Sequence, residues 1–125
     1  MTPDLSRPRA TPPYDILPAV PSFSLTSEDL ADGERMGDRF TAIHENLSPG
    51  LRWSGAPAGT RSFVVSCFDP DAPSPSGWWH WTVVDLPPSA AGLPRGAGES
   101  DDGLAAPAFH VRNDAGTRAW FGPYP

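Results

Sequence analysis

The chain has 125 residues, among them 17 prolines and 12 glycines, and this frequency of residues that interrupt regular structure excludes a helical bundle or a coiled coil. Its 15 acidic residues outnumber its 9 basic residues, all of which are arginine, and the net charge of -6 excludes the cationic surface that non-specific nucleic-acid binding requires. The apolar residues, 38% of the chain, suffice for the core of one domain.

Two further features of the composition bear on location and redox chemistry. No segment approaches the roughly 20 apolar residues of a membrane span, and the N-terminus lacks the continuous apolar stretch of a signal peptide. We therefore expect a cytoplasmic protein without stable membrane insertion. Cys67 is the only cysteine and lies in the apolar run 63–68, so it is interpreted as a buried thiol rather than a nucleophile.

The residue pattern predicts a mostly β domain over residues 22–125. The proline-rich segment 1–21 is expected to be extended or disordered. Alternation of apolar and polar residues predicts a strand over 22–26, a turn at Asp32-Gly33 and a second strand up to Phe40. The clearest strands are 63–68 and 80–86, which are rich in β-branched and aromatic residues. A long loop is predicted over 87–108 and a short strand over 108–111.

The most distinctive string of the sequence is Asp69-Pro70-Asp71-Ala72-Pro73, which places two carboxylates two residues apart at the end of a predicted strand. Because proline restricts both its own backbone and that of the residue before it, this loop is expected to be rigid. His80 opens the strand that returns from the loop. An antiparallel pairing of the two strands would place its ring near Asp69 or Asp71.

On the residues alone, four interpretations remain open for this cluster. It could bind an anion through His80, its carboxylates could bind a hard cation, or it could be a hydrolase with Asp71 and His80 as acid and base. The carboxylates could also only bond backbone N–H groups of the turn. The sequence contains neither a G-x-S-x-G elbow nor a zinc motif, so we assign no catalytic residue, metal or cofactor. Side-chain alternation predicts that Trp79 and Trp81 share one face of the strand and that His80 takes the other.

Several motifs in a fixed order resemble the phosphatidylethanolamine-binding protein family, and within it the bacterial Raf kinase inhibitor-like branch. They are Asp69 to Pro73, Gly77, His80-Trp81, Asn113-Asp114, Gly116 and Gly122-Pro123, and the resemblance covers about residues 22–125. It implies an antiparallel β-sandwich with a small pocket at one end that accepts phosphate-like anions. It also implies a cis peptide bond before Pro73.

The resemblance further implies which residues form the ligand site, namely Asp69, Asp71, Ala72, Trp79, His80, Gly122 and Pro123. The implied function is binding of a phosphate or a phospholipid headgroup without catalysis or cofactor, together with inhibition of a protein partner such as a kinase or a protease. A homodimer is also expected. The family continues with a His-Arg-Tyr-like strand, so this chain is expected to lack the C-terminal strands of the fold. An interaction domain with a degenerate pocket is therefore the alternative.

Overall fold

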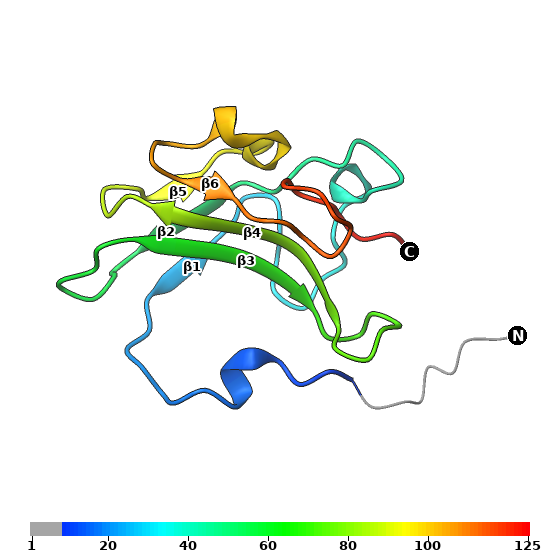
Figure 1. Ribbon diagram of the computed structural model, residues 1–125, viewed down its shortest axis with the longest axis horizontal. Coiled ribbons are helices and arrows are strands. Elements are labelled where there is room, and N and C mark those ends of the chain that lie inside the picture. Colours follow the sequence, from blue (N-terminus) through cyan, green and yellow to red (C-terminus); the bar gives the residue numbers. More distant parts are fainter. Residues whose placement is uncertain (1–8) are drawn as a thin grey trace, which may run out of the picture.

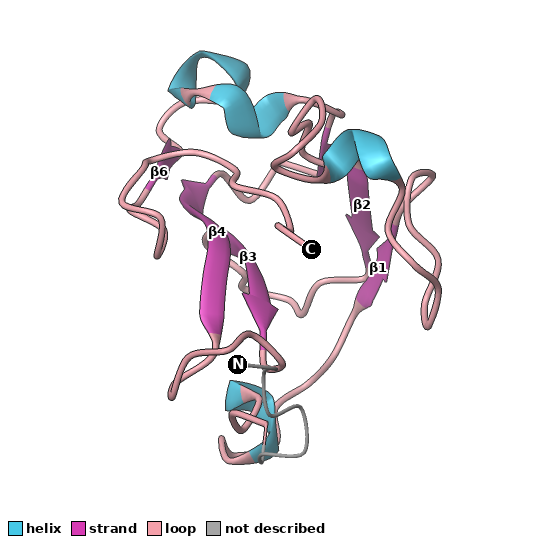
Figure 2. Cartoon of the chain, turned by 90° about the vertical axis from the view of Figure 1, so that its right-hand side faces the viewer, coloured by secondary structure: helices cyan, strands magenta, loops and turns pink. Residues whose placement is uncertain are grey.

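The computed structural model describes residues 9–125, which form two three-stranded antiparallel sheets that lie opposite one another as two layers (Figure 1 and Figure 2). The first sheet has the strand order β1-β2-β5 and the second the order β3-β4-β6. The strands are β1 Ser24–Thr26, β2 Leu51–Ser54, β3 Phe63–Asp69, β4 Trp78–Leu86, β5 Gly92–Leu93 and β6 Phe109–His110. The prediction of a mostly β sandwich is confirmed.

Outside the strands, the described part of the chain contains four short 3₁₀ helices and no α-helix. They are η1 Pro13–Asp15, η2 Asp38–Phe40, η3 Ala97–Glu99 and η4 Asp101–Gly103. Of the proline-rich segment predicted to be extended or disordered, residues 1–8 lie outside the described residues. Its remainder contains η1 and passes along the second sheet on the side of β3 (Figure 1).

The segment between β1 and β2 differs from the prediction. Asp32-Gly33 does form a turn, with Gly33 at a φ of 76°, but the strand predicted up to Phe40 is wrong, because this stretch consists of turns and η2. Phe40 is buried in the core, and its carbonyl oxygen accepts a hydrogen bond from the indole N–H of Trp120 at 3.1 Å. A long-range contact, rather than a neighbouring strand, therefore fixes this part of the backbone.

The core lies between the two sheets and is built largely from aromatic rings. Trp81 of β4 meets the ring of Trp120 edge to face, with the centroids 5.4 Å apart, and Trp53 of β2 lies 5.4 Å from Phe63 of β3. Such pairs add specific geometry to the apolar area that they bury. Cys67 of β3 packs against this core, and burial raises the pKa of its thiol to about 11. The raised pKa agrees with the interpretation that Cys67 is not a nucleophile, and its side chain is half-buried rather than buried.

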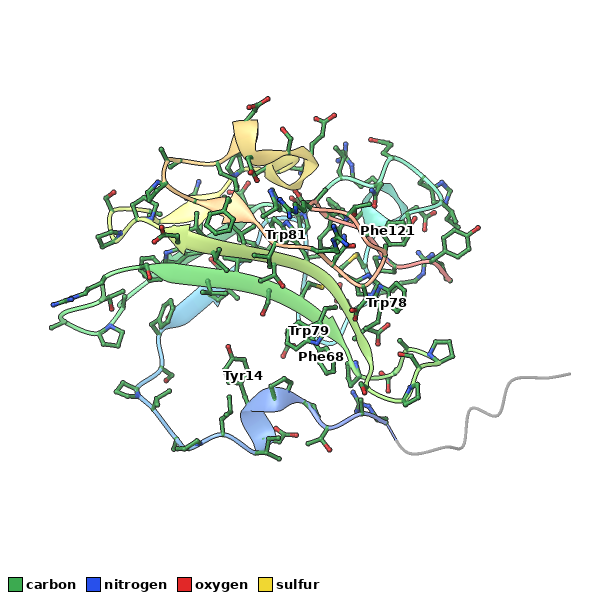
Figure 3. All side chains as sticks on the ribbon, viewed as in Figure 1. Tyr14, Phe68, Trp78, Trp79, Trp81 and Phe121 are labelled. Carbon is green, nitrogen blue, oxygen red and sulfur yellow. The ribbon has the colours of Figure 1, made fainter. Side chains whose placement is uncertain are left out.

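A β-bulge interrupts the pairing of β3 with β4 next to His80. Cys67 is the partner of Trp81, whereas the next residue, Phe68, is the partner of Trp79, so His80 is an extra residue of β4. The predicted common face of Trp79 and Trp81 is therefore wrong. Trp81 is buried in the core, while the ring of Trp79 packs on that of Phe68 at 4.6 Å (Figure 3).

Candidate functional site

His80 lies in the bulge of β4 with only 6% of its surface exposed. Its ring Nδ1 is 2.6 Å from the carbonyl oxygen of Phe121, and the N–H of Phe121 donates to the carbonyl of His80 at 3.1 Å. A carbonyl oxygen can only accept, so Nδ1 carries the hydrogen of this bond. The contact fixes the orientation of the imidazole and leaves Nε2 as the ring atom that is available for another group.

Asp69, the last residue of β3, faces that second ring nitrogen. Its Oδ2 lies 3.7 Å from Nε2 of His80, and its Oδ1 accepts the backbone N–H of Asp71 at 2.9 Å. The distance of 3.7 Å exceeds that of a hydrogen bond, and Nε2 has no hydrogen-bond partner among the described residues. The Asp69 side chain is 39% exposed, so the carboxylate beside the buried imidazole lies partly at the surface.

The loop from Pro70 to Gly77 carries the other predicted carboxylate, Asp71, on an exposed side chain. Asp71 forms an ion pair with Nε of Arg9 at 2.5 Å, and both side chains are largely exposed. Of the two carboxylates that the sequence predicted near His80, Asp69 is therefore the one that faces it. The half-buried Ala72 belongs to the same loop and accepts the N–H of Ser74 at 2.7 Å.

The closure of this loop depends on Gly77 rather than on a cis proline. Gly77 has a φ of 72°, and a Cβ there would lie 2.6 Å from the ring of Phe68. The cis peptide bond expected before Pro73 is wrong, because the cis bond of the described residues is Ala106-Pro107. The side chain of Ser74 closes the loop instead, by donating to the carbonyl of Gly77.

The C-terminal segment forms the wall behind His80. Gly122 donates its N–H to the side-chain oxygen of Asn46 at 2.7 Å, and the carbonyl of Pro123 accepts the N–H of Ala42 at 2.8 Å. A Cβ on Gly122 would lie 1.9 Å from the carbonyl oxygen of Phe40, so only glycine can pass at this point. Gly122 and Pro123 thus hold the carbonyl of Phe121 against the imidazole.

The two tryptophans before His80 have different positions. The ring of Trp78 lies 6.5 Å from that of His80, at the same end of the sheet as Phe121 (Figure 3). Trp79 instead holds a neighbouring turn, because its N–H donates to Oδ2 of Asp114 at 2.7 Å and its carbonyl accepts the N–H of Asp114 at 3.0 Å. Trp79 therefore lies beside the site rather than against the imidazole.

Sequence reasoning missed two groups that the structure brings to His80, and for different reasons. The carbonyl of Phe121 is a backbone group, and no side-chain pattern signals it. Trp78 is the strand partner of Asp69, so the antiparallel register could have placed it there. No group of three or more histidine, cysteine, aspartate or glutamate residues within residues 9–125 is arranged to hold a metal ion.

The comparisons with known proteins agree with this architecture. The family model for phosphatidylethanolamine-binding protein matches residues 26–125. UPF0098 protein YbhB of Escherichia coli strain K12 is 43% identical over an alignment of 108 residues that covers 82% of this chain and 68% of YbhB. UPF0098 protein YbcL of the same strain is 43% identical over an alignment of 110 residues that covers 83% of this chain and 60% of YbcL. The chain belongs to the phosphatidylethanolamine-binding protein family.

A solved structure confirms the relationship at the level of the fold. The crystal structure of E. coli YbcL, described as a new member of the mammalian family, superposes with a TM-score of 0.80 at 42% identity and covers 82% of this chain and 66% of YbcL. The chain thus spans about two thirds of the length of the relatives that it matches.

The cytoplasmic location stays a prediction. None of the helices among residues 9–125 is long and apolar enough to cross a membrane. LppC of Mycobacterium tuberculosis, which its name proposes to be a lipoprotein, is 31% identical over 94% of this chain and 59% of LppC. The names of the relatives therefore do not indicate the same cellular compartment for all of them.

Proposed function

We propose that this protein binds a small phosphate-like anion in the gap between His80 and Asp69 and does not convert it chemically. One observation carries the proposal: Nε2 of His80 is buried, has no hydrogen-bond partner among the described residues, and lies 3.7 Å from a partly exposed carboxylate. A buried polar atom costs free energy unless it is satisfied, so a ligand that bonds to Nε2 is stabilising.

A monoprotonated phosphate has the donor and the acceptor that this gap requires. Protonated His80 donates from Nε2 to a phosphate oxygen, because Nδ1 is already engaged with the carbonyl of Phe121. The P–OH group donates to Oδ2 of Asp69 and so avoids placing two negative charges against each other. The site then binds an anion although the chain carries a net charge of -6.

The alternative of a hydrolase that uses Asp71 and His80 finds less support in the geometry. A general acid and base must both reach the reacting atoms. Asp71 is paired with Arg9 in solvent, and the carboxylate beside His80 is Asp69.

Isothermal titration with inorganic phosphate and with phosphorylethanolamine tests the proposal. We expect His80→Ala and Asp69→Asn each to weaken binding at least tenfold, which corresponds to about 1.4 kcal/mol. The exposed His44 supplies the matched control, and His44→Ala is expected to bind like the wild type. A preference for phosphorylethanolamine over phosphate would assign the site to a lipid headgroup rather than to the free ion.

Two results would overturn the proposal. One is binding that His80→Ala leaves unchanged, and the other is hydrolysis of a phosphomonoester by the wild type that is lost in His80→Ala while ligand affinity persists. The second result would promote the enzyme alternative. Absence of any binding by the wild type at millimolar ligand would favour the interaction domain with a degenerate pocket.

A further inference from the structure

Residues 120–123 pass between β4 and the loop that follows η2, two parts of the chain that are far apart in the sequence (Figure 1). Toward β4, Phe121 contacts His80 through both of its backbone groups. Its N–H donates to the carbonyl oxygen of His80 at 3.1 Å, and its carbonyl oxygen accepts the hydrogen of ring Nδ1 at 2.6 Å. The position of the imidazole therefore depends on the two peptide groups that join Phe121 to its neighbours.

Asn46, in the loop after η2, holds the other end of each of these peptide groups. Its side-chain NH₂ donates to the carbonyl oxygen of Trp120 at 3.3 Å, and its side-chain oxygen accepts the N–H of Gly122 at 2.7 Å. The carbonyl of Trp120 and the N–H of Phe121 belong to one planar peptide group, and the carbonyl of Phe121 and the N–H of Gly122 belong to the next. Each group is thus bonded to Asn46 at one end and to His80 at the other.

This arrangement makes the orientation of His80 depend on Asn46 through the backbone. A peptide group is planar and rigid, so a bond that fixes its N–H also fixes the direction of its carbonyl. Hydrogen bonds that follow one another in this way also polarise one another. A carboxamide is suited to hold both peptide groups, because it combines an N–H donor with an oxygen acceptor, as a peptide group of a neighbouring strand would.

The backbone of Asn46 favours the same residue type. Its φ is 54°, in the left-handed region, where asparagine is enriched several-fold over most other residues with a side chain. Glycine also adopts this backbone without strain, but it lacks the carboxamide. Asn46→Gly therefore removes the two side-chain hydrogen bonds and leaves the local backbone conformation accessible.

Other bonds anchor the C-terminal segment on both sides of Phe121. The N–H of Trp120 donates to the carbonyl of Gly98 at 2.8 Å, and the carbonyl of Pro123 accepts the N–H of Ala42 at 2.8 Å. Removal of the carboxamide thus leaves the segment attached and releases the two peptide groups in its middle. The variant is expected to fold.

We propose that Asn46 is a positioning residue of the anion site, an inference that rests on the function proposed for His80. Through the peptide groups on either side of Phe121, its carboxamide keeps the hydrogen of the neutral imidazole on Nδ1 and holds the ring in place. Nε2 then stays 3.7 Å from Oδ2 of Asp69 and is the ring atom that gains the proton and donates it to a phosphate oxygen.

The ¹⁵N NMR spectrum of the histidine rings measures this effect without any ligand. The chemical shifts of the two nitrogens of a neutral imidazole report which of them carries the hydrogen. In the wild type, we expect the hydrogen of neutral His80 on Nδ1. In Asn46→Gly, we expect a mixture of the two tautomers, because the carbonyl of Phe121 is no longer fixed. A loss of stability alone would not change the tautomer.

Titration calorimetry with inorganic phosphate measures the consequence for binding. We expect Asn46→Gly to bind phosphate about fivefold more weakly, the factor that corresponds to one hydrogen bond of ordinary net strength. Asp85→Gly is the matched control, because Asp85 also has a positive φ, 59°, and its exposed side chain lies near the other end of β4 from His80. This control is expected to keep both the tautomer and the phosphate affinity of the wild type.

Asn46→Asp is the second variant in case Asn46→Gly alters the fold. An aspartate keeps the acceptor for the N–H of Gly122 but has no N–H for the carbonyl of Trp120. Because one of the two bonds remains, we expect a proportion of the two tautomers between those of the wild type and of Asn46→Gly.

The inference is overturned if both variants keep the tautomer of the wild type, or if Asn46→Gly mixes the tautomers but binds phosphate as the wild type does. A change of tautomer of equal size in Asp85→Gly would overturn it as well. Failure of the wild type to bind phosphate would overturn the function proposed for His80, whereas the tautomers of the variants would still decide whether Asn46 positions the imidazole.

Discussion

Two histidines of the second sheet share most of their surroundings and differ in one respect. His80 on β4 and His110 on β6 are both buried, both form a hydrogen bond through Nδ1, and both leave Nε2 without a hydrogen-bond partner among the described residues. Nε2 of His80 faces the partly exposed Asp69 at the end of the sheet. The side chain of His110 is completely enclosed, and its ring lies 6.3 Å from that of Trp81, whose indole nitrogen also has no hydrogen-bond partner there.

The difference shows what a binding site needs beyond an unsatisfied atom. Both imidazoles have a ring nitrogen without a hydrogen-bond partner among the described residues, but that of His80 lies 3.7 Å from a partly exposed carboxylate, whereas that of His110 belongs to a fully enclosed side chain. His110 instead joins β6 to η4, because Asp101 accepts both its backbone N–H at 2.8 Å and its Nδ1 at 2.9 Å. The proposed ligand-binding role of His80 and the structural contact of His110 with Asp101 each have measurable consequences.

The largest effect is expected where the wall behind His80 is disturbed. The Cβ of Gly122→Ala would lie 1.9 Å from the backbone oxygen of Phe40, which cannot move without displacing the core. We expect this substitution to lower the free energy of unfolding by at least about 3 kcal/mol. Urea denaturation measures the change.

Gly37 provides the control for this experiment because it also adjoins Phe40. A Cβ on Gly37 would lie 3.5 Å from the phenyl ring, an ordinary contact, and its φ of -62° suits any residue. Gly37→Ala is expected to change the free energy of unfolding by less than about 1 kcal/mol. Equal stabilities of the two alanine variants would contradict the conclusion that the backbone of Phe40 leaves no space for a Cβ at position 122.

The next effect separates the two histidines directly. His110→Ala removes a fully enclosed ring and leaves a cavity, so we expect a loss of about 2 to 4 kcal/mol of unfolding free energy. Its affinity for phosphate, measured on the folded variant, is expected to equal that of the wild type, whereas His80→Ala is expected to bind at least tenfold more weakly. A tenfold loss of phosphate affinity in His110→Ala would show that the two imidazoles do not divide their roles in this way.

Low pH is expected to reduce the stability that the contact between Asp101 and His110 contributes. The hydrogen bonds from the backbone and ring of His110 lower the pKa of Asp101 from its ordinary value of 3.8. A carboxyl with a lowered pKa in the folded state contributes stability above its unfolded pKa, and this stability is lost as the pH falls through the folded pKa. We expect Asp101→Asn to remove part of the loss of stability below about pH 4, measured by urea unfolding from pH 3 to pH 6.

The neighbouring Asp102 is the matched control for this pH dependence. It is exposed like Asp101, and its carboxylate accepts no hydrogen bond among the described residues. Asp102→Asn is expected to preserve the wild-type curve of stability against pH. Identical curves for Asp101→Asn and the wild type would mean that the contact with His110 contributes nothing in acid.

Around His80, the strands were predicted correctly but the positions of the side chains were not. The β character of 63–68 and 80–86 was predicted correctly, because β-branched and aromatic runs between prolines and glycines leave little alternative. The predicted alternation of side chains fails at one residue. A bulge adds His80 to β4, so Trp79 and Trp81 do not share one face of the strand. Neither the bulge nor the carbonyl of Phe121 has a side-chain signature, so the buried imidazole and its bond could not be predicted.

The smallest effect is expected at Asp71, which the resemblance groups with Asp69. Its ion pair with Arg9 joins two side chains that are 63% and 64% exposed, and such pairs contribute less than about 1 kcal/mol because water screens the charges. We expect Asp71→Asn to change the unfolding free energy by no more than this and phosphate affinity by less than twofold, and 0.5 M salt should erase the difference in stability. By contrast, Asp69→Asn, two residues earlier in the sequence, is expected to bind phosphate at least tenfold more weakly. If both variants lost phosphate affinity equally, the carboxylate of Asp71 would have to turn toward His80 when ligand binds. Asp69 would then not be the only carboxylate that contributes to binding.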